Sequence, residues 1–227
     1  MMFERLRESV TFWWHNLGAI ALVTIPFSLL SSALVLLAGA PLVRTDTGDL
    51  ELNGLTLTLV FVIRTLSEAA LIAQLAAIAA GRPRGLAECA LFALTIAPAM
   101  LLCNVLVLTG TSLGLLAFIL PGIWIYIRLS MASFAVALEK AAPLEALQRS
   151  FSRTTAVQWE LLSGWLLLLT ALLLITSVIG GVLGDLTGNH AGAAVVLDLL
   201  TAVGAALLHV LVFRYYGLLK QPDQSSL

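Results

Sequence analysis

Long apolar runs dominate the chain, and the polar residues gather in the shorter segments between them. A helix rises about 1.5 Å per residue and the hydrocarbon layer of a membrane is about 30 Å thick, so about 20 apolar residues suffice for one crossing. No segment shows the alternation of apolar and polar positions that is typical of a membrane barrel strand. We therefore predict an all-α, polytopic membrane protein that forms one integral membrane domain over residues 1–227. Its six transmembrane helices are expected at residues 17–40, 55–80, 86–108, 112–128, 161–183 and 193–213.

The fourth apolar run is too long for one straight crossing. Residues 111–140 contain no polar break, and as a single helix they would extend about 45 Å. Pro121 lacks a backbone N–H and is followed by Gly122, so we predict that the helix bends or breaks at this pair. Residues 129–140 would then lie at the cytoplasmic surface of the membrane or enter it as a re-entrant segment, and the sequence leaves both paths open.

Two further segments alternate apolar and charged positions with the period of a helix. In residues 143–154, Leu144, Leu147 and Phe151 share one helical face, and the charged side chains lie on the other. Residues 3–14 show the same pattern. Each segment precedes a predicted span, so we expect two amphipathic helices on the cytoplasmic side of the membrane.

The distribution of positive charge predicts the orientation of the spans. Lys and Arg are concentrated before the first span, between the second and third, after the fourth and at the end of the sixth. Cytoplasmic segments carry such a surplus, so both termini are predicted to be cytoplasmic. The Trp and Tyr residues map to the same side, where amphipathic rings anchor at headgroup depth. We expect the cytoplasmic interface to include Trp124, Arg128, Arg149, Arg153 and Trp159.

Composition excludes several classes of protein. The chain is 60% hydrophobic and 11% charged, whereas a soluble domain is about 45–50% apolar and about 25% charged. An ordinary soluble enzyme and a disordered protein are both excluded by this balance. The net charge of −1 leaves no basic surplus to neutralise phosphates, so we expect no nucleic-acid partner.

Charged residues interrupt the second span. Arg64 and Glu68 are one helical turn apart near its middle. Together they oppose insertion into the membrane by about 5–7 kcal/mol, while the apolar residues of the span favour insertion by about 4–7 kcal/mol. We therefore predict that this span faces the protein interior and that Arg64 pairs with Glu68. Asp198 in the sixth span is placed to reach Arg64 and to complete a cluster of three charges.

This intramembrane cluster has two interpretations. It lines a path or binding site for a charged headgroup or solute, or it is a structural ion pair that fixes helix packing. Asn104 and Gln74 are expected to form hydrogen bonds between helices. We expect His209 to lie at the cytoplasmic interface as a satisfied polar residue rather than as a proton relay.

No motif predicts catalysis, a metal site or a cofactor. Residues 110–114 match the G-x-S-x-G string of serine hydrolases, but that motif works only as a turn between a strand and a helix. The His and Cys residues lack the spacing of metal ligands, and no glycine-rich phosphate-binding loop is present. We therefore predict a protein that is not an enzyme and that binds neither a metal nor a cofactor.

Four short stretches between residues 120 and 150 form a pattern known from other membrane proteins. They are Leu120-Pro121-Gly122-Ile123, Arg128-Leu129-Ser130, Leu138-Glu139-Lys140 and Leu144-Glu145-Ala146-Leu147-Gln148-Arg149-Ser150. The pattern resembles the YciC-like family of bacterial inner-membrane proteins. It is also similar to the membrane domain attached to some glycerophosphodiester phosphodiesterases. The resemblance implies a six-span inner-membrane protein of undefined activity, and it carries over no catalytic residue.

Two functional hypotheses follow from these observations. The first is a non-enzymatic inner-membrane protein that engages membrane lipids, an envelope protein partner or a second copy of itself. The second is a small channel or carrier whose polar path is lined by Arg64, Glu68 and Asp198. A cavity beside these side chains favours the second hypothesis, whereas tight packing on all sides would exclude it.

The predicted topology can be checked with reporter fusions. A fluorescent protein fused after Leu227 is expected to fluoresce, because the positive charges keep the C-terminus in the cytoplasm. Alkaline phosphatase fused at the same position is expected to stay inactive, since it folds only in the periplasm. Phosphatase activity without fluorescence would overturn the predicted orientation.

Overall fold

The chain folds almost entirely into helices. The computed structural model describes residues 2–44, 49–187 and 190–220. Within these residues the elements in chain order are α1 (Met2–His15), α2 (Leu17–Ala38), β1 (Leu42–Arg44), β2 (Leu50–Leu52), α3 (Gly54–Ala79), α4 (Leu86–Ala117), α5 (Ile119–Leu129), α6 (Ala132–Glu139), α7 (Pro143–Arg153), the 3-10 turn η1 (Thr154–Ala156), α8 (Gln158–Thr187) and α9 (His190–Lys220).

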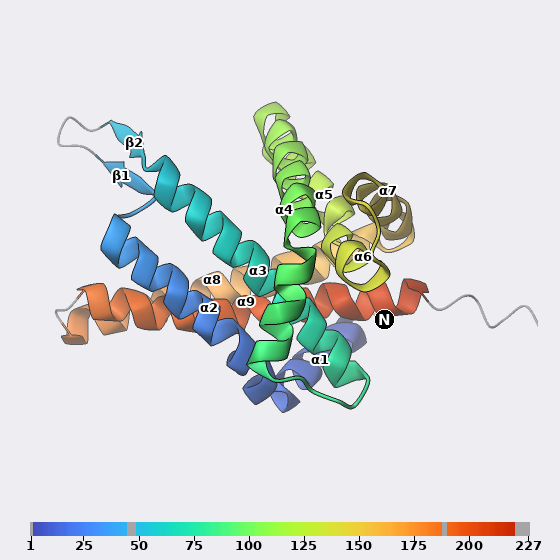
Figure 1. The fold of residues 1–227 in the computed structure, drawn as a ribbon, viewed down its shortest axis with the longest axis horizontal. Coiled ribbons are helices and arrows are strands. Elements are labelled where there is room, and N and C mark those ends of the chain that lie inside the picture. The colour runs from blue at the N-terminus through green and yellow to red at the C-terminus, as the bar shows by residue number, and fades with distance from the viewer. Residues whose placement is uncertain (1, 45–48, 188–189, 221–227) are drawn as a thin grey trace, which may run out of the picture.

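Six helical stretches are long and apolar enough to cross a membrane, as the apolar runs predict. Five are single helices, and the fourth is built from α5 and α6 together. Strands β1 and β2 pair in antiparallel register, with Leu42 opposite Leu52, so a short hairpin follows α2. Figure 1 shows this hairpin at the same end of the molecule as the end of α8 and the start of α9. The stretches are Leu17–Ala38, Gly54–Ala79, Leu86–Ala117, Ile119–Glu139, Gln158–Gly184 and Gly192–Leu219.

The connection between α4 and α5 differs from the prediction. Helix α4 continues beyond Leu108 to Ala117, because the glycines at positions 110 and 114 each cost a helix only about 1 kcal/mol. The chain instead breaks at Phe118, whose backbone is extended at φ −173° and ψ 157°. Pro121 lies in the first turn of α5, where its missing N–H removes no helical hydrogen bond. The predicted break at Pro121 and Gly122 is therefore wrong, and it lies three residues earlier.

Gly122 has a different role, which is to bring α4 and α5 into contact. A Cβ atom on Gly122 would lie 2.4 Å from Cγ of Leu115. A Cβ atom on Gly114 would lie 2.8 Å from Cα of Gly122. Both distances are much shorter than an ordinary van der Waals contact, so only glycine allows the two backbones to approach this closely.

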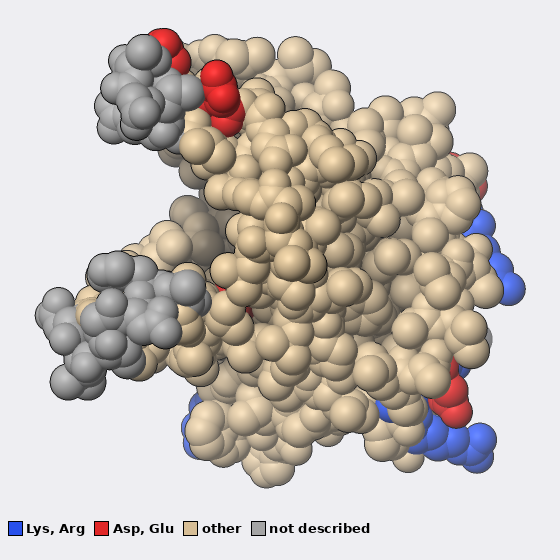
Figure 2. Space-filling view, turned by 60° about the vertical axis from the view of Figure 1, so that its left-hand side comes forward, with Lys and Arg blue, Asp and Glu red and all other residues tan. Residues whose placement is uncertain are grey.

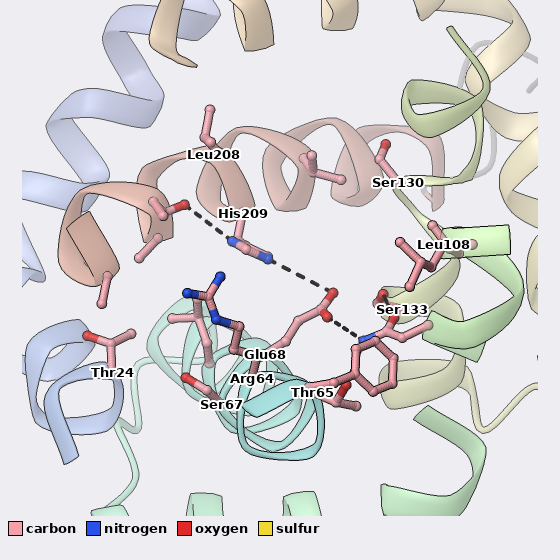
Figure 3. A pocket seen from close by; sticks show the side chains of 18 of the residues that line it. Thr24, Arg64, Thr65, Ser67, Glu68, Leu108, Ser130, Ser133, Leu208 and His209 are labelled. Carbon is pink, nitrogen blue, oxygen red and sulfur yellow. Dashed lines mark hydrogen bonds and ion pairs between the residues drawn. The ribbon is translucent and has the colours of Figure 1, made fainter. Parts of the chain in front are cut away.

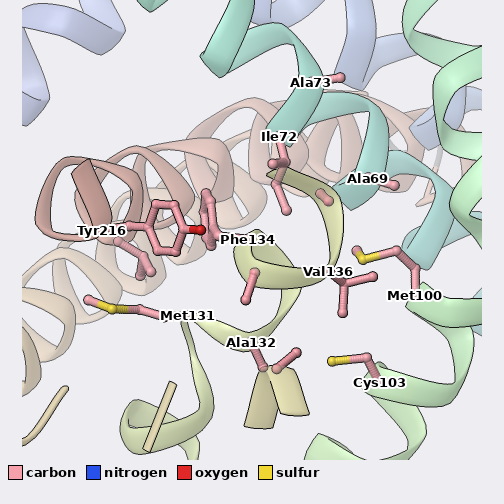
Figure 4. Packing of buried hydrophobic residues seen from close by; sticks show 14 of the residues in the cluster. Ala69, Ile72, Ala73, Met100, Cys103, Met131, Ala132, Phe134, Val136 and Tyr216 are labelled. Carbon is pink, nitrogen blue, oxygen red and sulfur yellow. The ribbon is translucent and has the colours of Figure 1, made fainter. Parts of the chain in front are cut away.

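Helix α6 is buried inside the helical bundle. Residues 131–137 are at most 6% exposed. Figure 4 shows Phe134 beside Tyr216 of α9, while Val136 faces Met100 and Cys103 of α4. The rings of Phe134 and Tyr216 have centroids 5.6 Å apart. Residues 131–137 thus belong to the core of the bundle, and both predicted paths of residues 129–140 relative to the membrane remain open.

One acidic residue joins the end of α6 to two other helices. Glu139 accepts hydrogen bonds from Arg149 (2.5 Å) and Arg153 (2.6 Å) of α7 and from the Tyr216 hydroxyl of α9 (2.5 Å). The bonds to Glu139 hold the pKa of the Arg149 and Arg153 guanidinium groups above its ordinary value. We call these four residues the Glu139 network. The Glu139 network fixes α7 against the core, because the Glu139 side chain that joins them is only 10% exposed.

The most deeply buried residues of helix α7 are small. Ala146 and Ser150 are buried against the end of α5. The Ser150 hydroxyl donates to the carbonyl oxygen of Arg128 (2.8 Å) and accepts from the backbone N–H of Met131 (3.1 Å). The predicted apolar face is divided: Leu144 remains 66% exposed, whereas Leu147 packs against the core and the Phe151 ring contacts the Arg128 guanidinium.

The visible charged residues lie at the edges of the molecule. In Figure 2 the face of the protein is largely uncharged, while Lys and Arg appear at its right and lower edges. Acidic side chains appear in the lobe that carries the β1–β2 hairpin, and others appear beside the basic ones at the right edge.

Substitution of Gly122 tests the close contact between α4 and α5. Gly122→Ala is expected to lower the free energy of unfolding by about 1–3 kcal/mol, because the added methyl group overlaps Leu115. Gly181→Ala is the matched control, since a Cβ atom there meets nothing within 4 Å. Unfolding in detergent by titration with dodecyl sulfate measures both. Equal stability of the two variants would contradict the proposed contact.

Candidate functional site

A cavity of about 630 Å³ lies between α2, α3, α4 and α9, and it is bordered by residues of α5, α6 and α8. Figure 3 shows side chains from these helices pointing into it. We call it the central cavity. Its polar lining consists of Thr24, Ser28, Ser31, Arg64, Thr65, Ser67, Glu68, Asn104, Thr111, Tyr126, Ser130, Ser133, Asp198, Thr201 and His209.

The helical repeat brings the polar residues to the cavity. On α2 the lining residues are Thr24, Ser28 and Ser31, and on α9 they include Asp198 and Thr201. Spacings of three and four residues place side chains on one helical face. Each of these apolar helices therefore carries a narrow polar stripe, and the stripes meet in the bundle interior.

Glu68 contacts two other helices rather than Arg64. Its Oε2 atom accepts a hydrogen bond from the Asn104 side chain of α4 (2.8 Å). Its Oε1 atom lies 3.9 Å from Nε2 of His209 in α9. Asn104 also donates to Thr65 (3.3 Å), and it accepts from Ser133 of α6 (3.3 Å). The carboxylate of Glu68 thus joins α3, α4 and α9 at one wall of the cavity.

Arg64 is not paired with Glu68, and this prediction is wrong. Among the described residues Arg64 forms neither a hydrogen bond nor an ion pair. Figure 3 shows its guanidinium group on the same side of α3 as His209. The i,i+4 spacing allows the pair but does not enforce it, because the neighbouring helices offer Glu68 other partners. An arginine with free donors therefore lines the cavity.

Asp198 is also held by neutral partners. Its Oδ2 atom accepts hydrogen bonds from the hydroxyl groups of Ser28 (2.8 Å) and Ser32 (2.6 Å) of α2. The predicted contact between Asp198 and Arg64 does not form. Arg64, Glu68 and Asp198 nevertheless line one cavity. They come together around a shared space rather than as an ion cluster.

The sequence reasoning missed the partners of these charges. Ser28 and Ser32 are four residues apart on the first span, and this polar pair was a usable signal for a stripe facing the interior. His209 was placed at the interface, but it faces Glu68 across the cavity. The hydrogen bonds of Asn104 between helices are confirmed. Gln74 is confirmed as well, since it bonds Cys89 of α4 and the carbonyl of Ala19 in α2.

The residues expected at the cytoplasmic interface differ in exposure. Arg128 is only 5% exposed. Its guanidinium donates to Thr155 (2.8 Å) and to Gln158 (3.1 Å), and it lies 3.8 Å from the ring centroid of Phe151. Trp124 is half-buried beside it, with a ring centroid 5.4 Å from the guanidinium. Arg128 therefore acts as a packing residue beneath α7 and does not face the surface.

The aromatic belt is less complete than the sequence indicated. Trp14 and Trp159 are 66% and 68% exposed, as interfacial anchors would be. Tyr215 and Tyr216 are instead buried in the core. Trp165 also lies inside, where its ring stands 5.2 Å from that of Tyr126, and both border the central cavity.

The described residues contain no group of three or more His, Cys, Asp or Glu side chains arranged to hold a metal ion. Cys89 and Cys103 are free and buried. The ionisable side chains that line the cavity are Arg64, Glu68, Asp198, His209 and Tyr126. The chemistry that this arrangement provides is charge recognition: a free guanidinium donor, two carboxylates held in place and an imidazole.

Substitution of Asn104 tests the bridge between the cavity helices. Asn104→Leu is expected to lower the free energy of unfolding by about 1–3 kcal/mol, because it leaves the Glu68 carboxylate and the Ser133 hydroxyl without their partner. Thr109→Val on the same helix is the control, since the Thr109 hydroxyl bonds only the Val105 carbonyl of its own helix. Titration with dodecyl sulfate compares the two. An Asn104→Leu variant as stable as the control would show that the bridge contributes nothing.

No family model matches the chain, and neither a curated protein nor a solved structure matches it. The resemblance to the YciC-like family therefore stays a prediction. The function has to be argued from the central cavity and its charges.

Proposed function

We propose that this chain is a six-span bacterial inner-membrane protein that takes up a charged ligand in its central cavity, as a small channel or carrier. Both termini are on the cytoplasmic side in this proposal. The observation that carries it is that Arg64, Glu68, Asp198 and His209 line one cavity while Arg64 has free donors. The polar path therefore has a space in which a ligand can lie.

The cost of these charges supports a functional role. A central arginine or acidic residue opposes membrane insertion by about 2.5–3.5 kcal/mol. A structural ion pair would offset part of this cost, but the described residues include no ion pair between Arg64 and either acid. Charged groups within apolar spans that face a cavity are typical of ion and substrate pathways.

A catalytic role has less support than ligand binding. His209 contacts Glu68 and the carbonyl oxygen of Ala205 (3.3 Å). Within the described part of the chain it forms no hydrogen bond with a serine or cysteine side chain. Ser112, the serine of the G-x-S-x-G string, is exposed on α4 and is not among the residues that line the cavity. We therefore propose a non-enzymatic function.

Contact with membrane lipids is a second candidate function, and exposed aromatic residues favour it. Phe3 and Trp14 of α1 are 70% and 66% exposed, and Trp159 at the start of α8 is 68% exposed. Arg214 of α9 pairs with Glu8 of α1 (2.8 Å), so α1 is held against α9. An amphipathic helix with such a face lies in the interface between headgroups and acyl chains. In our proposal this contact positions the protein while the central cavity holds the ligand.

Cysteine labelling tests whether the central cavity is a polar path. In a variant without Cys89 and Cys103, Ser67→Cys is expected to react with charged methanethiosulfonate reagents, because Ser67 lines the cavity. Leu173→Cys is the control, since Leu173 is 56% exposed on the apolar surface of α8 and is expected to stay unlabelled in lipid. Mass spectrometry of labelled spheroplasts measures the reaction. An unreactive Ser67→Cys would contradict the proposal.

The same experiment reports on Arg64. Arg64→Gln is expected to slow the labelling of Ser67→Cys by an anionic reagent relative to a cationic reagent of the same size, because it removes a positive charge from the cavity lining. Arg82→Gln, at an exposed turn outside the cavity, should leave this ratio of rates unchanged. If both substitutions change the ratio equally, Arg64 does not act on ligands in the cavity.

A further inference from the structure

The central cavity is lined by both charged and apolar side chains. The charged side chains and His209 come from α3 and α9. The larger apolar side chains come from five helices and include Phe61, Val107, Leu108, Leu129, Trp165 and Val212. A hydrated ion gains nothing from apolar side chains, because they cannot replace its water ligands. The lining is instead complementary to a molecule with a polar end and an apolar body.

The cavity is also open toward the outer surface of the helices. Leu108 lines it and is still 55% exposed. Figure 1 shows the α4–α5 hairpin diverging from the α2–α3 pair toward its far end. Figure 2 shows the surface hollowed between the lobe that carries the β1–β2 hairpin and the lobe formed by the ends of α8 and α9. If these helices span the membrane, an acyl chain can reach the cavity without leaving lipid.

The charges in the cavity call for a ligand that carries both signs. Arg64 offers free guanidinium donors, which suit a phosphate group. Asp198 and Glu68 accept hydrogen bonds from the uncharged side chains of Ser28 and Asn104, and their carboxylate oxygens can accept further hydrogen bonds from a cationic group. Glu68, Asp198 and Arg64 together carry a formal surplus of one negative charge. A purely anionic ligand would meet repulsion at two of these three positions.

Resting on the proposed function, we propose that the ligand of the central cavity is a zwitterionic phospholipid with a primary ammonium headgroup. Arg64 binds the phosphate, and Asp198 and Glu68 accept hydrogen bonds from the ammonium group. The apolar side chains around Leu108 and Leu129 contact the first part of the acyl chains. The lipid is expected to bind more tightly than the free headgroup, because its acyl chains cover apolar surface of the cavity that a soluble headgroup would leave exposed.

Native mass spectrometry of the full chain in detergent tests this assignment. The probes are phosphatidylethanolamine, phosphatidylglycerol with the same acyl chains, and glycerophosphoethanolamine, which has the headgroup without the chains. Phosphatidylethanolamine is expected to bind at least about tenfold more tightly than either of the others. Arg64→Gln should remove most of this binding, Arg64→Lys should restore part of it, and Arg82→Gln should leave it unchanged. Asp198→Asn should reduce the preference over phosphatidylglycerol.

The outcomes separate this inference from the proposed function. Equal binding of the two lipids would overturn the zwitterionic headgroup, and equal binding of glycerophosphoethanolamine would overturn the lipid in favour of a soluble ligand. Loss of binding in Arg82→Gln as well as in Arg64→Gln would also overturn the assignment, because it would indicate general destabilisation. If no probe binds while Ser67→Cys still reacts with charged reagents, the lipid assignment fails and the polar path stands. If Ser67→Cys also fails to react with charged reagents, both the lipid assignment and the proposed polar path are wrong.

Discussion

The fold depends on the need of each polar side chain in an apolar helix for a partner. Within a membrane core there is no bulk water to satisfy such groups, so other side chains or a polar cavity must do so. The hydroxyl groups of Ser28 and Ser32 bind Asp198, and Asn104 joins Glu68 to Ser133. These contacts cross between helices and therefore select which faces of α2, α3, α4 and α9 meet.

Two parts of the bundle satisfy this need differently. At the end of α6, Glu139 accepts hydrogen bonds from Arg149, Arg153 and Tyr216. Close contact through Gly122 and the buried face of α7 make this part tightly packed. Around Arg64 the polar groups surround a cavity. A well-packed support beside a polar cavity is the arrangement expected of a binding site held in place by its scaffold.

The residues that carry the resemblance to the YciC-like family belong to the packed part and not to the cavity charges. Arg128 and Ser150 hold α5 against α7, and Glu139 joins α6 to α7 and α9. The spacing of these residues is thus explained by packing between short helices. Such a pattern informs about architecture, whereas the ligand is decided by Arg64, Glu68 and Asp198 on other helices.

The sequence by itself determined the six apolar helices and the interior placement of polar residues, because hydrophobic length and insertion cost are local properties of a segment. It could not determine whether Arg64 pairs with Glu68. The i,i+4 geometry permits this pair, but Asn104 and His209, which lie on other helices, contact Glu68 instead. The sequence also misplaced the helix break, because the close contact at Gly122 depends on a facing helix. Only the tertiary structure decided which polar stripes share a cavity, as that depends on how helices distant in sequence are rotated and packed.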